Sequence, residues 1–338
     1  MAAEKGWKIL DWLKGGLHRA VSLIIYGEIL GKALCAVLLP TPWAVKVMPV
    51  SLAARLLPVS FHRRVIENLE AVFGEAYTEE EKRAISRRYF GQFFVYLLDF
   101  FLGVRMKASD VDRIFVFEGR ENVDEALRQG KGIIGVTGHY CWAVRGLLAI
   151  GCLGVPLSAV ILHAEDIPFN KLDWLLRLVQ RRVRKRTGVD WIFPGGAVSR
   201  VDQKLKQNEA VAFTLDVPHF GEQKGGMRVP FLGGEVMFPA ALIDLAVRSE
   251  ACLLPAFVMP RKGSPCFGIR VHPPLVPRTR DEAGVRECLE HCSRMLESLI
   301  REEPEHWWLW KDLKQFWSPS GVGDQGSGVR ARPYTLDT

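Results

Sequence analysis

The chain has 338 residues, of which 48% are hydrophobic and 25% are charged, a composition that excludes an intrinsically disordered protein. Lys and Arg number 45 against 38 Asp and Glu, and the net charge of +7 is compatible with an anionic membrane surface, a phosphorylated substrate or an acidic protein partner. Because no nucleic-acid-binding motif is present, we expect no nucleic acid partner. The seven cysteines are irregularly spaced and form no metal-binding pattern, so we expect free thiols, a reducing compartment and no metal.

The N-terminal region, residues 1–60, is unusually apolar. Residues 20–39 form a mostly apolar run in which Glu28 and Lys32 are spaced to pair on one helix face. Two charges near the middle are rare in a membrane-spanning helix, and the preceding stretch, residues 6–17, combines Trp and Lys as interfacial helices do. We expect residues 1–60 to form a helical membrane anchor. A membrane span, a helix lying on the membrane surface and a soluble helical lid all remain open.

A helical zone follows, over residues 62–103. The sequence from Thr78 to Glu81 is typical of a helix start. The apolar and aromatic stripe of the helix that follows is more typical of a core than of a cofactor site; its members are Ile85, Tyr89, Phe90, Phe93, Phe94, Tyr96, Leu97 and Phe100.

From residue 114 the pattern alternates between strands and helices. This alternation predicts an α/β fold with a mixed, mostly parallel sheet flanked by helices. The strands are expected at Ile114–Glu118, Gly132–Thr137, Leu157–Leu162, Ala210–Leu215, Ala251–Val258 and Gly268–Val271. The helices are expected at Asn122–Gln129, Trp142–Ile150, Pro168–Arg182, Ser199–Gln207, Pro239–Ser249 and Glu282–Glu302. We expect one domain over residues 61–318 and a disordered Gly/Ser-rich tail over residues 319–338.

His139 is the first candidate for chemistry. The buried strand before it breaks at Gly138, which places His139 at a strand-to-helix turn, suited to a general base. Amides at the start of the helix from Trp142 can stabilise an oxyanion. The alternative is a structural histidine. A nucleophilic Cys141 with His139 as its base is a further option, although a small free cysteine is usually a packing residue.

Asp216 and the loop after it are the second candidate region. Asp216 ends a predicted strand, as His139 does, and ligands gather at the carboxyl ends of strands in α/β sheets, so the two residues are expected to converge. The alternative is an Asp that caps a turn. Residues 225–234 are interpreted as a loop in which Phe231 lines an acyl slot and Arg228 meets a phosphate or carboxylate; an ordinary hairpin with an exposed Arg is the alternative.

Two further clusters have both structural and functional interpretations. Residues 181–186 contain five cations, typical of a solvated helix end or of a docking patch for phosphates or an acidic carrier protein. Residues 305–310 are rich in indoles, as in a membrane interface or in a C-terminal element packed on the core.

Several blocks, in this order and spacing, resemble the lipid A late acyltransferases (lauroyl/myristoyl transferases) of the lysophospholipid acyltransferase superfamily. The resemblance covers roughly residues 10–317 and rests on the apolar N-terminus, Ile66–Leu69, Thr137–His139, Asp216, Val229–Phe231, Pro239, Leu245–Ala246, Pro255–Phe257 and Trp308–Lys311. It implies a glycerolipid-acyltransferase-like fold and acyl transfer in lipid A and lipopolysaccharide biosynthesis. The reaction would take place at the cytoplasmic face of the bacterial inner membrane.

The resemblance also implies the partners and the roles of the site. The donor would be an acyl-carrier-protein or CoA thioester and the acceptor a hydroxyl of a glycolipid or lysolipid, without cofactor or metal. His139 would be the general base, and in the family a carboxylate five residues later orients it. The residues Trp142, His163, Arg228 and Phe231 would contact substrate.

The chain departs from the family pattern at two positions. The family places an acid five residues after the histidine, where this chain has Val144, and it often has Arg where this chain has His163. Asp216 or Glu165 would then orient His139, or the base would act unassisted, or the protein would have lost transferase activity and kept lipid binding. N-acylation of an amine acceptor is also open, because a free amine needs less activation than an alcohol.

Overall fold

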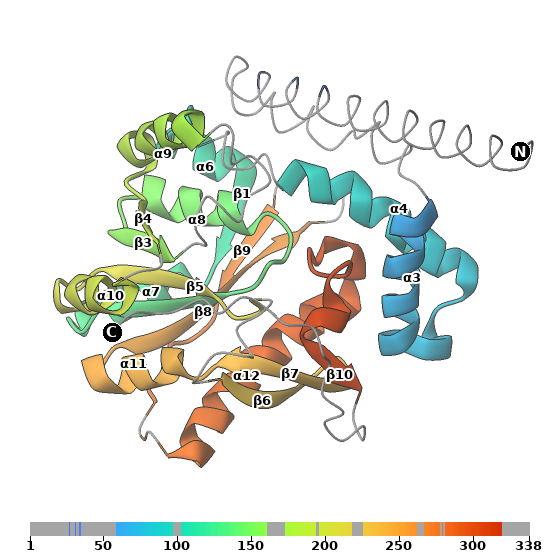
Figure 1. Cartoon of the computed structure of the whole chain (residues 1–338). Coiled ribbons are helices and arrows are strands. Elements are labelled where there is room, and N and C mark those ends of the chain that lie inside the picture. Colours follow the sequence, from blue (N-terminus) through green and yellow to red (C-terminus); the bar gives the residue numbers. More distant parts are fainter. Residues whose placement is uncertain are drawn as a thin grey trace, which may run out of the picture.

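The computed structural model describes residues 59–96, 103–160, 173–193, 196–217, 226–261, 267–277, 279 and 281–319, together with Gly27, Gly31 and Leu34. A seven-stranded sheet runs through the centre (Figure 1). Its strand order is β1 (Phe115–Glu118), β9 (Phe267–Val271), β8 (Cys252–Pro260), β2 (Ile133–Thr137), β5 (Ala210–Thr214), β3 (Leu157–Val160) and β4 (Asp190–Ile192). Neighbouring strands are parallel except β8 and β9, which confirms the predicted mixed, mostly parallel sheet.

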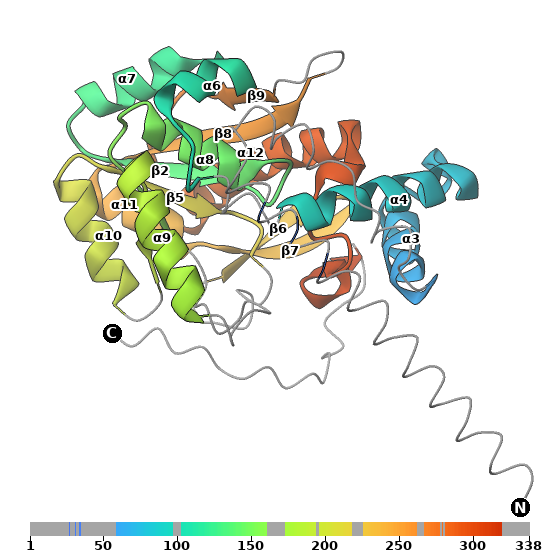
Figure 2. The same cartoon turned by 90° about the horizontal axis from the view of Figure 1, so that it is seen from above.

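Helices cover both faces of this sheet (Figures 1 and 2). On one side α8 (Ala143–Cys152) packs against α6 (Ala108–Ile114) and α9 (Asp173–Thr187). On the other, α11 (Ala241–Ser249) lies between α10 (Ala197–Lys206) and α12 (Glu282–Glu302), while α7 (Arg120–Arg128) contacts β8 and β9. The expected helices are therefore present, with ends shifted by a few residues.

A smaller antiparallel sheet decides between the two interpretations of residues 225–234. The loop interpretation is wrong and the alternative, a hairpin, is confirmed: the segment contains β6 (Gly226–Phe231), which pairs with β7 (Gly234–Pro239). Leu232 and Gly233 make its two-residue turn with φ angles of 53° and 75°, the left-handed geometry that such turns require. The third strand, β10 (Trp317–Pro319), pairs with β7, and β6 packs on α12.

Two helices, α3 (Val59–Phe73) and α4 (Glu79–Tyr96), pack on each other beside the sheet (Figure 2). Of the predicted apolar stripe, Ile85, Tyr89 and Phe90 are buried, so this part of the stripe is core. The α3–α4 pair is fastened to residues 303–310, which we call the tryptophan segment. Arg88 Nε lies 2.6 Å from Glu305 Oε1, and the Tyr89 hydroxyl donates to the carbonyl of Trp308 at 2.8 Å.

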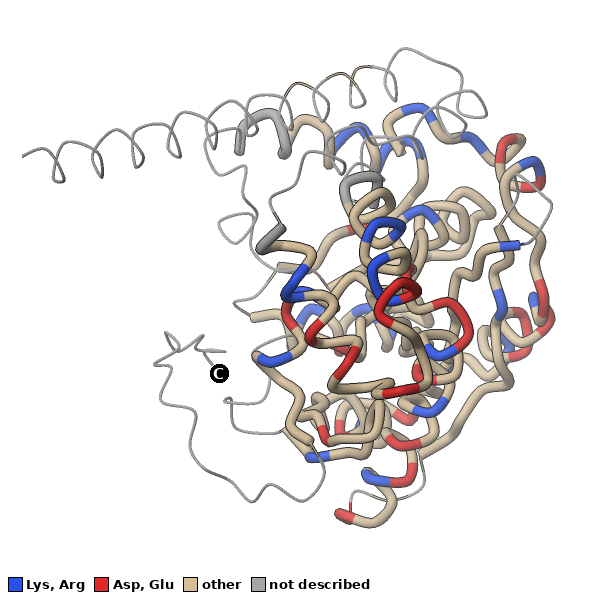
Figure 3. Tube along the Cα trace, turned by 90° about the vertical axis from the view of Figure 1, so that its right-hand side faces the viewer, with Lys and Arg blue, Asp and Glu red and all other residues tan. Residues whose placement is uncertain are grey.

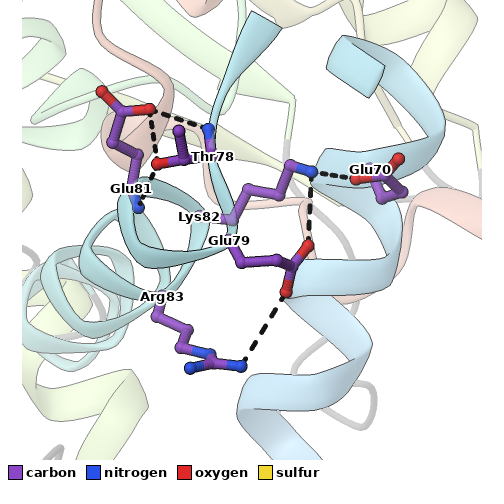
Figure 4. Close-up of polar contacts among 6 residues, drawn as sticks. All are labelled: Glu70, Thr78, Glu79, Glu81, Lys82 and Arg83. Carbon is purple, nitrogen blue, oxygen red and sulfur yellow. Dashed lines mark hydrogen bonds and ion pairs between the residues drawn. The ribbon is translucent and has the colours of Figure 1, made fainter. Parts of the chain in front are cut away.

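The start of α4 is held by polar contacts that the sequence indicated (Figure 4). The Glu81 amide donates to Thr78 Oγ1 at 3.3 Å, and the Thr78 amide donates to Glu81 Oε2 at 2.8 Å, which is a capping box. Next to it the buried Lys82 ammonium contacts the carboxylates of Glu70 on α3 and Glu79 on α4. The hydrogen bond that the Lys82 ammonium donates to the Glu70 carboxylate raises the pKa of Lys82, so this lysine is a charged link between the two helices.

The expected membrane anchor, residues 1–60, lies almost entirely outside the described residues, as does residue 320 onward of the expected tail. Among the helices that the structure does describe, none has the length and apolar character needed to cross a membrane.

Candidate active site

His139 and Asp216 meet because β2 and β5 are neighbouring parallel strands in register. Thr137 at the end of β2 is opposite Thr214 at the end of β5, and the Leu215 amide donates to the Thr137 carbonyl at 2.8 Å. His139 and Asp216 each follow two residues later, at the carboxyl edge of the sheet. This is the convergence that strand ends in an α/β sheet predict.

Gly138, between strand and histidine, is required by close packing. A side chain at this position would bring its Cβ to 2.7 Å from the Leu296 side chain of α12. The chain can therefore turn tightly against α12 before it presents His139. A glycine here fixes where the histidine leaves the sheet.

The Asp216 carboxylate is buried and binds His139 through both its backbone and its ring. The His139 amide donates to Asp216 Oδ1 at 2.9 Å and to Oδ2 at 3.0 Å. The ring nitrogen Nδ1 lies 2.9 Å from Oδ1. A carboxylate only accepts, so Nδ1 carries the proton and Nε2 of the neutral ring has the free lone pair. The side chain of His139 is 26% exposed, so the imidazole is accessible while its acid is not.

The tryptophan segment completes the shell around this pair. The Trp307 indole donates to Asp216 Oδ2 at 2.7 Å, and the Trp308 amide donates to the His139 carbonyl at 2.9 Å. Tyr140 and Trp307 form an isolated antiparallel bridge. Cys141 has a left-handed φ of 49°. Its amide donates to the His306 carbonyl at 2.9 Å, and its carbonyl accepts from the Trp308 indole at 2.8 Å. These bonds on both sides hold a strained residue next to the histidine.

The electrostatics of the pair favour a basic imidazole. Burial lowers the pKa of His139, but the Asp216 carboxylate raises it by charge and by hydrogen bonding, and the pKa lies above its usual value. The ring is thus a stronger base than a free histidine. An imidazole with one nitrogen fixed on a buried carboxylate and the other turned outward is the arrangement of a general base and its orienting acid.

Val144, where an acid was expected, lies in the first turn of α8 and packs against the core. The acid beside His139 is Asp216 instead. The next residue, Arg145, is 1% exposed, and its Cζ lies 3.0 Å from the centroid of the Trp142 ring. A buried cation is therefore placed within two turns of the catalytic candidate, stacked on an indole.

The other predicted site residues lie in different settings. Trp142 is buried between Arg145 and the Phe267 ring, whose centroid is 5.0 Å away. Phe231 is buried and contacts the Trp307 ring edge to face at 5.8 Å, so it supports the tryptophan segment. Arg228 is on the exposed face of β6. His163 and Glu165 lie outside the described residues.

Trp307 is the site residue that the sequence interpretation missed. The indole-rich stretch was visible, but nothing in the sequence links residue 307 to residue 216 across 91 positions. The available signal was general: a tryptophan that packs in the core usually needs a hydrogen-bond acceptor for its indole N–H, but the sequence does not say which acceptor. In the described part of the chain, no cluster of His, Cys, Asp and Glu is arranged to hold a metal ion.

Comparison with known proteins identifies the family of the chain. A comparison with curated proteins finds no match. The family model of bacterial lipid A biosynthesis acyltransferases, however, matches residues 15–315, which is most of the chain and includes the central sheet, the His139 turn and the tryptophan segment. The chain therefore belongs to the bacterial lipid A biosynthesis acyltransferase family, and it is an acyltransferase.

Proposed function

We propose that this acyltransferase moves a fatty acyl group from an acyl-carrier-protein thioester to a hydroxyl of a lipid A-type glycolipid. His139 is the general base and Asp216 the acid that orients it. The observation that carries the proposal is the 2.9 Å contact between His139 Nδ1 and the buried Asp216 carboxylate. It offers an orienting acid in place of the one that the family pattern has at the position of Val144.

The proposed reaction has two steps. The acceptor hydroxyl gives its proton to His139 Nε2 as its oxygen attacks the thioester carbonyl carbon, and Asp216 stabilises the imidazolium that forms. The tetrahedral intermediate then collapses, the C–S bond breaks, and the imidazolium returns the proton to the departing thiolate. The products are an ester and a free carrier thiol. No cofactor is needed in this scheme, because the thioester itself activates the acyl group.

The oxyanion of the intermediate needs donors near His139. We assign this role to the amides at the start of α8, because α8 begins at Ala143, just after the histidine turn, and a helix N-terminus stabilises negative charge. The acyl slot is assigned to the apolar residues around Phe231, with His163, Arg228 and Trp142 as further substrate contacts.

The reaction is placed at the cytoplasmic face of the bacterial inner membrane. Both the acceptor glycolipid and the acyl product are membrane lipids, and the apolar residues 1–60 have the composition of an anchor for an anionic membrane surface. The organisation proposed is an anchor over residues 1–60, a catalytic domain over 61–318 and a tail over 319–338.

Acyl transfer by the purified full chain tests the proposal, with carrier-protein and CoA thioesters as donors. Glycolipid, lysolipid and amino-lipid acceptors are offered, and products are read by mass spectrometry. We expect ester product from the carrier-protein donor, lowered at least about 10³-fold in His139→Ala. Val144→Ala is the matched control and retains activity. Equal product from wild type and His139→Ala would reject His139 as the base, and amide product alone would reject the hydroxyl acceptor.

A further inference from the structure

A second polar site lies between α3 and the residues that follow the tryptophan segment. A cavity of about 410 Å³ opens there. Arg63, Arg64 and Glu67 of α3 line one wall, and Lys311, Asp312 and Lys314 line the other. We call this the α3 pocket. Its volume lies within the range of small-molecule sites.

The charges of the α3 pocket do not cancel. Lys314 Nζ is 3.4 Å from Glu67 Oε2, and the Lys311 ammonium contacts the Asp312 carboxylate, so both acids are engaged by lysines. Arg63 and Arg64 are exposed, and within the described residues no carboxylate lies in ion-pair range of either. Within the part of the chain that the structure describes, the pocket therefore keeps two positive charges that no carboxylate offsets.

We propose that the α3 pocket binds the phosphate group of an anionic lipid. Guanidinium groups match phosphate geometry by paired hydrogen bonds, and both Arg63 and Arg64 line the pocket, which suits it to a phosphate monoester. Phe61, which is 43% exposed, is one helical turn before Arg64, and an exposed aromatic ring next to cations is typical of a membrane interface. Figure 3 faces this side of the molecule, where cationic and acidic positions are interspersed.

The α3 pocket is joined to the active site through the tryptophan segment. Lys311 directly follows Trp310, whose carbonyl accepts a hydrogen bond from the buried Asn68 amide of α3 at 2.5 Å. The same segment carries Trp307, which binds Asp216. One continuous stretch, residues 307–314, thus carries both the indole that binds Asp216 and one wall of the pocket. A phosphate held here would fix a lipid relative to His139, an assignment to the acceptor that rests on the proposed function.

Binding of a soluble short-chain lipid tests the pocket without any need for activity. The full chain in a neutral detergent is titrated with dihexanoylphosphatidic acid, with dihexanoylphosphatidylcholine and inorganic phosphate as comparison ligands. The test variant is Arg63→Gln/Arg64→Gln. Its matched control is Arg181→Gln/Arg182→Gln, which removes two adjacent exposed arginines from α9. Because none of these four arginines has a described carboxylate partner, the thermal midpoint is expected to stay unchanged and serves as the check on folding.

We expect the phosphatidic acid affinity to fall about tenfold or more in Arg63→Gln/Arg64→Gln and to stay unchanged in the α9 control. Phosphatidylcholine should bind weakly to all three proteins. Equal losses in both double variants would show general charge attraction and overturn the site, as would no loss in either. Competition by inorganic phosphate alone at equal affinity would overturn the lipid assignment.

A kinetic measurement then separates acceptor from membrane lipid. If the acceptor's phosphate occupies the pocket, Arg63→Gln/Arg64→Gln raises KM for the phosphorylated acceptor and leaves KM for its dephosphorylated form unchanged. If both KM values stay unchanged while phosphatidic acid binding is lost, the pocket holds a membrane phospholipid. The two proposals can fail independently. Loss of phosphatidic acid binding in Arg63→Gln/Arg64→Gln with unchanged activity concerns the pocket alone, and loss of activity only in His139→Ala concerns the base alone.

Discussion

Two charged clusters in this molecule bury groups of opposite charge. At the active site the acid, Asp216, is buried, and its partner His139 is partly open to solvent. Between α3 and α4 the cation, Lys82, is buried, and its partners Glu70 and Glu79 are exposed. Both clusters satisfy the buried member with several hydrogen-bonding groups, as a buried charge requires.

The difference teaches which cluster can do chemistry. Asp216 gives one oxygen to the imidazole and the other to the Trp307 indole, so the proton on His139 Nδ1 has one defined position and Nε2 faces outward. The Lys82 ammonium stays charged near neutral pH, because its pKa is raised, and its side chain is buried away from solvent. The first cluster positions a proton, and the second ties two helices together.

The largest expected effect comes from Asp216→Asn. An amide keeps the shape but cannot hold the Nδ1 proton, so we expect kcat/KM to fall about 10³- to 10⁴-fold. The wild-type rate falls as pH drops through the raised pKa of His139, because the protonated ring is no base. In Asp216→Asn burial still lowers the pKa of His139 while the carboxylate is gone. The acidic limb of the residual pH profile should therefore move to lower pH, and an unmoved limb would show that Asp216 does not act through His139.

Trp307→Phe should cost about tenfold in kcat, because one hydrogen bond to a charged group is lost while the ring remains. Without the indole donor, the Asp216 carboxylate interacts more strongly with His139, and the pKa of His139 rises. The acidic limb should move to higher pH, opposite to Asp216→Asn. Pre-steady-state kinetics and circular dichroism separate this from unfolding. If the acidic limb of the pH profile stays in place and only the thermal midpoint falls, Trp307 has a packing role alone.

Lys82→Met should lower the thermal midpoint and leave the activity of the folded fraction unchanged. Methionine keeps an apolar stem but loses the contacts to Glu70 and Glu79. The raised pKa of Lys82 keeps it charged well above neutral pH, so the loss is the same at pH 6 and pH 8. Salt should narrow the difference, because the two carboxylates are exposed. A changed KM in this variant would contradict the division between the two clusters.

The smallest effect is expected for Thr78→Ala, which removes the helix cap of α4. A lost cap costs about 1 kcal/mol of stability, measured by urea unfolding. Thr78→Ser, which retains the hydroxyl, is the matched control and should behave as wild type. Equal stability of Thr78→Ala and wild type would show that Glu81 alone closes the helix end.

Much of the sheet was predictable because buried parallel strands are short apolar runs between helical patterns. The convergence of His139 and Asp216 followed from their places after two such strands, and the structure brings them into contact. The three-residue β4 was too short to give a pattern, and the Gly-rich ends of β6 and β7 looked like a loop. Local sequence patterns predict strands and turns, but they do not predict which strands pair with each other.

The candidate site was only partly predictable for the same reason. Trp307 reaches Asp216 through a contact that spans 91 positions of the sequence, and a tryptophan buried in a core gives the same sequence pattern as one that lines a site. Phe231 was expected at an acyl slot, and its contacts show that it also supports Trp307. Chemistry that depends on a distant donor leaves no local mark in a sequence.

The order of His139, Asp216 and Trp307 along the sequence has a consequence for synthesis. The three residues come from widely separated parts of the sequence, and Trp307 is translated after every strand of the central sheet. Since chains leave the ribosome from the N-terminus, a nascent chain contains both His139 and Asp216 before it contains the indole that binds the Asp216 carboxylate. A chain released before residue 307 would therefore carry the imidazole and its acid without the Trp307 N–H that holds Asp216 Oδ2.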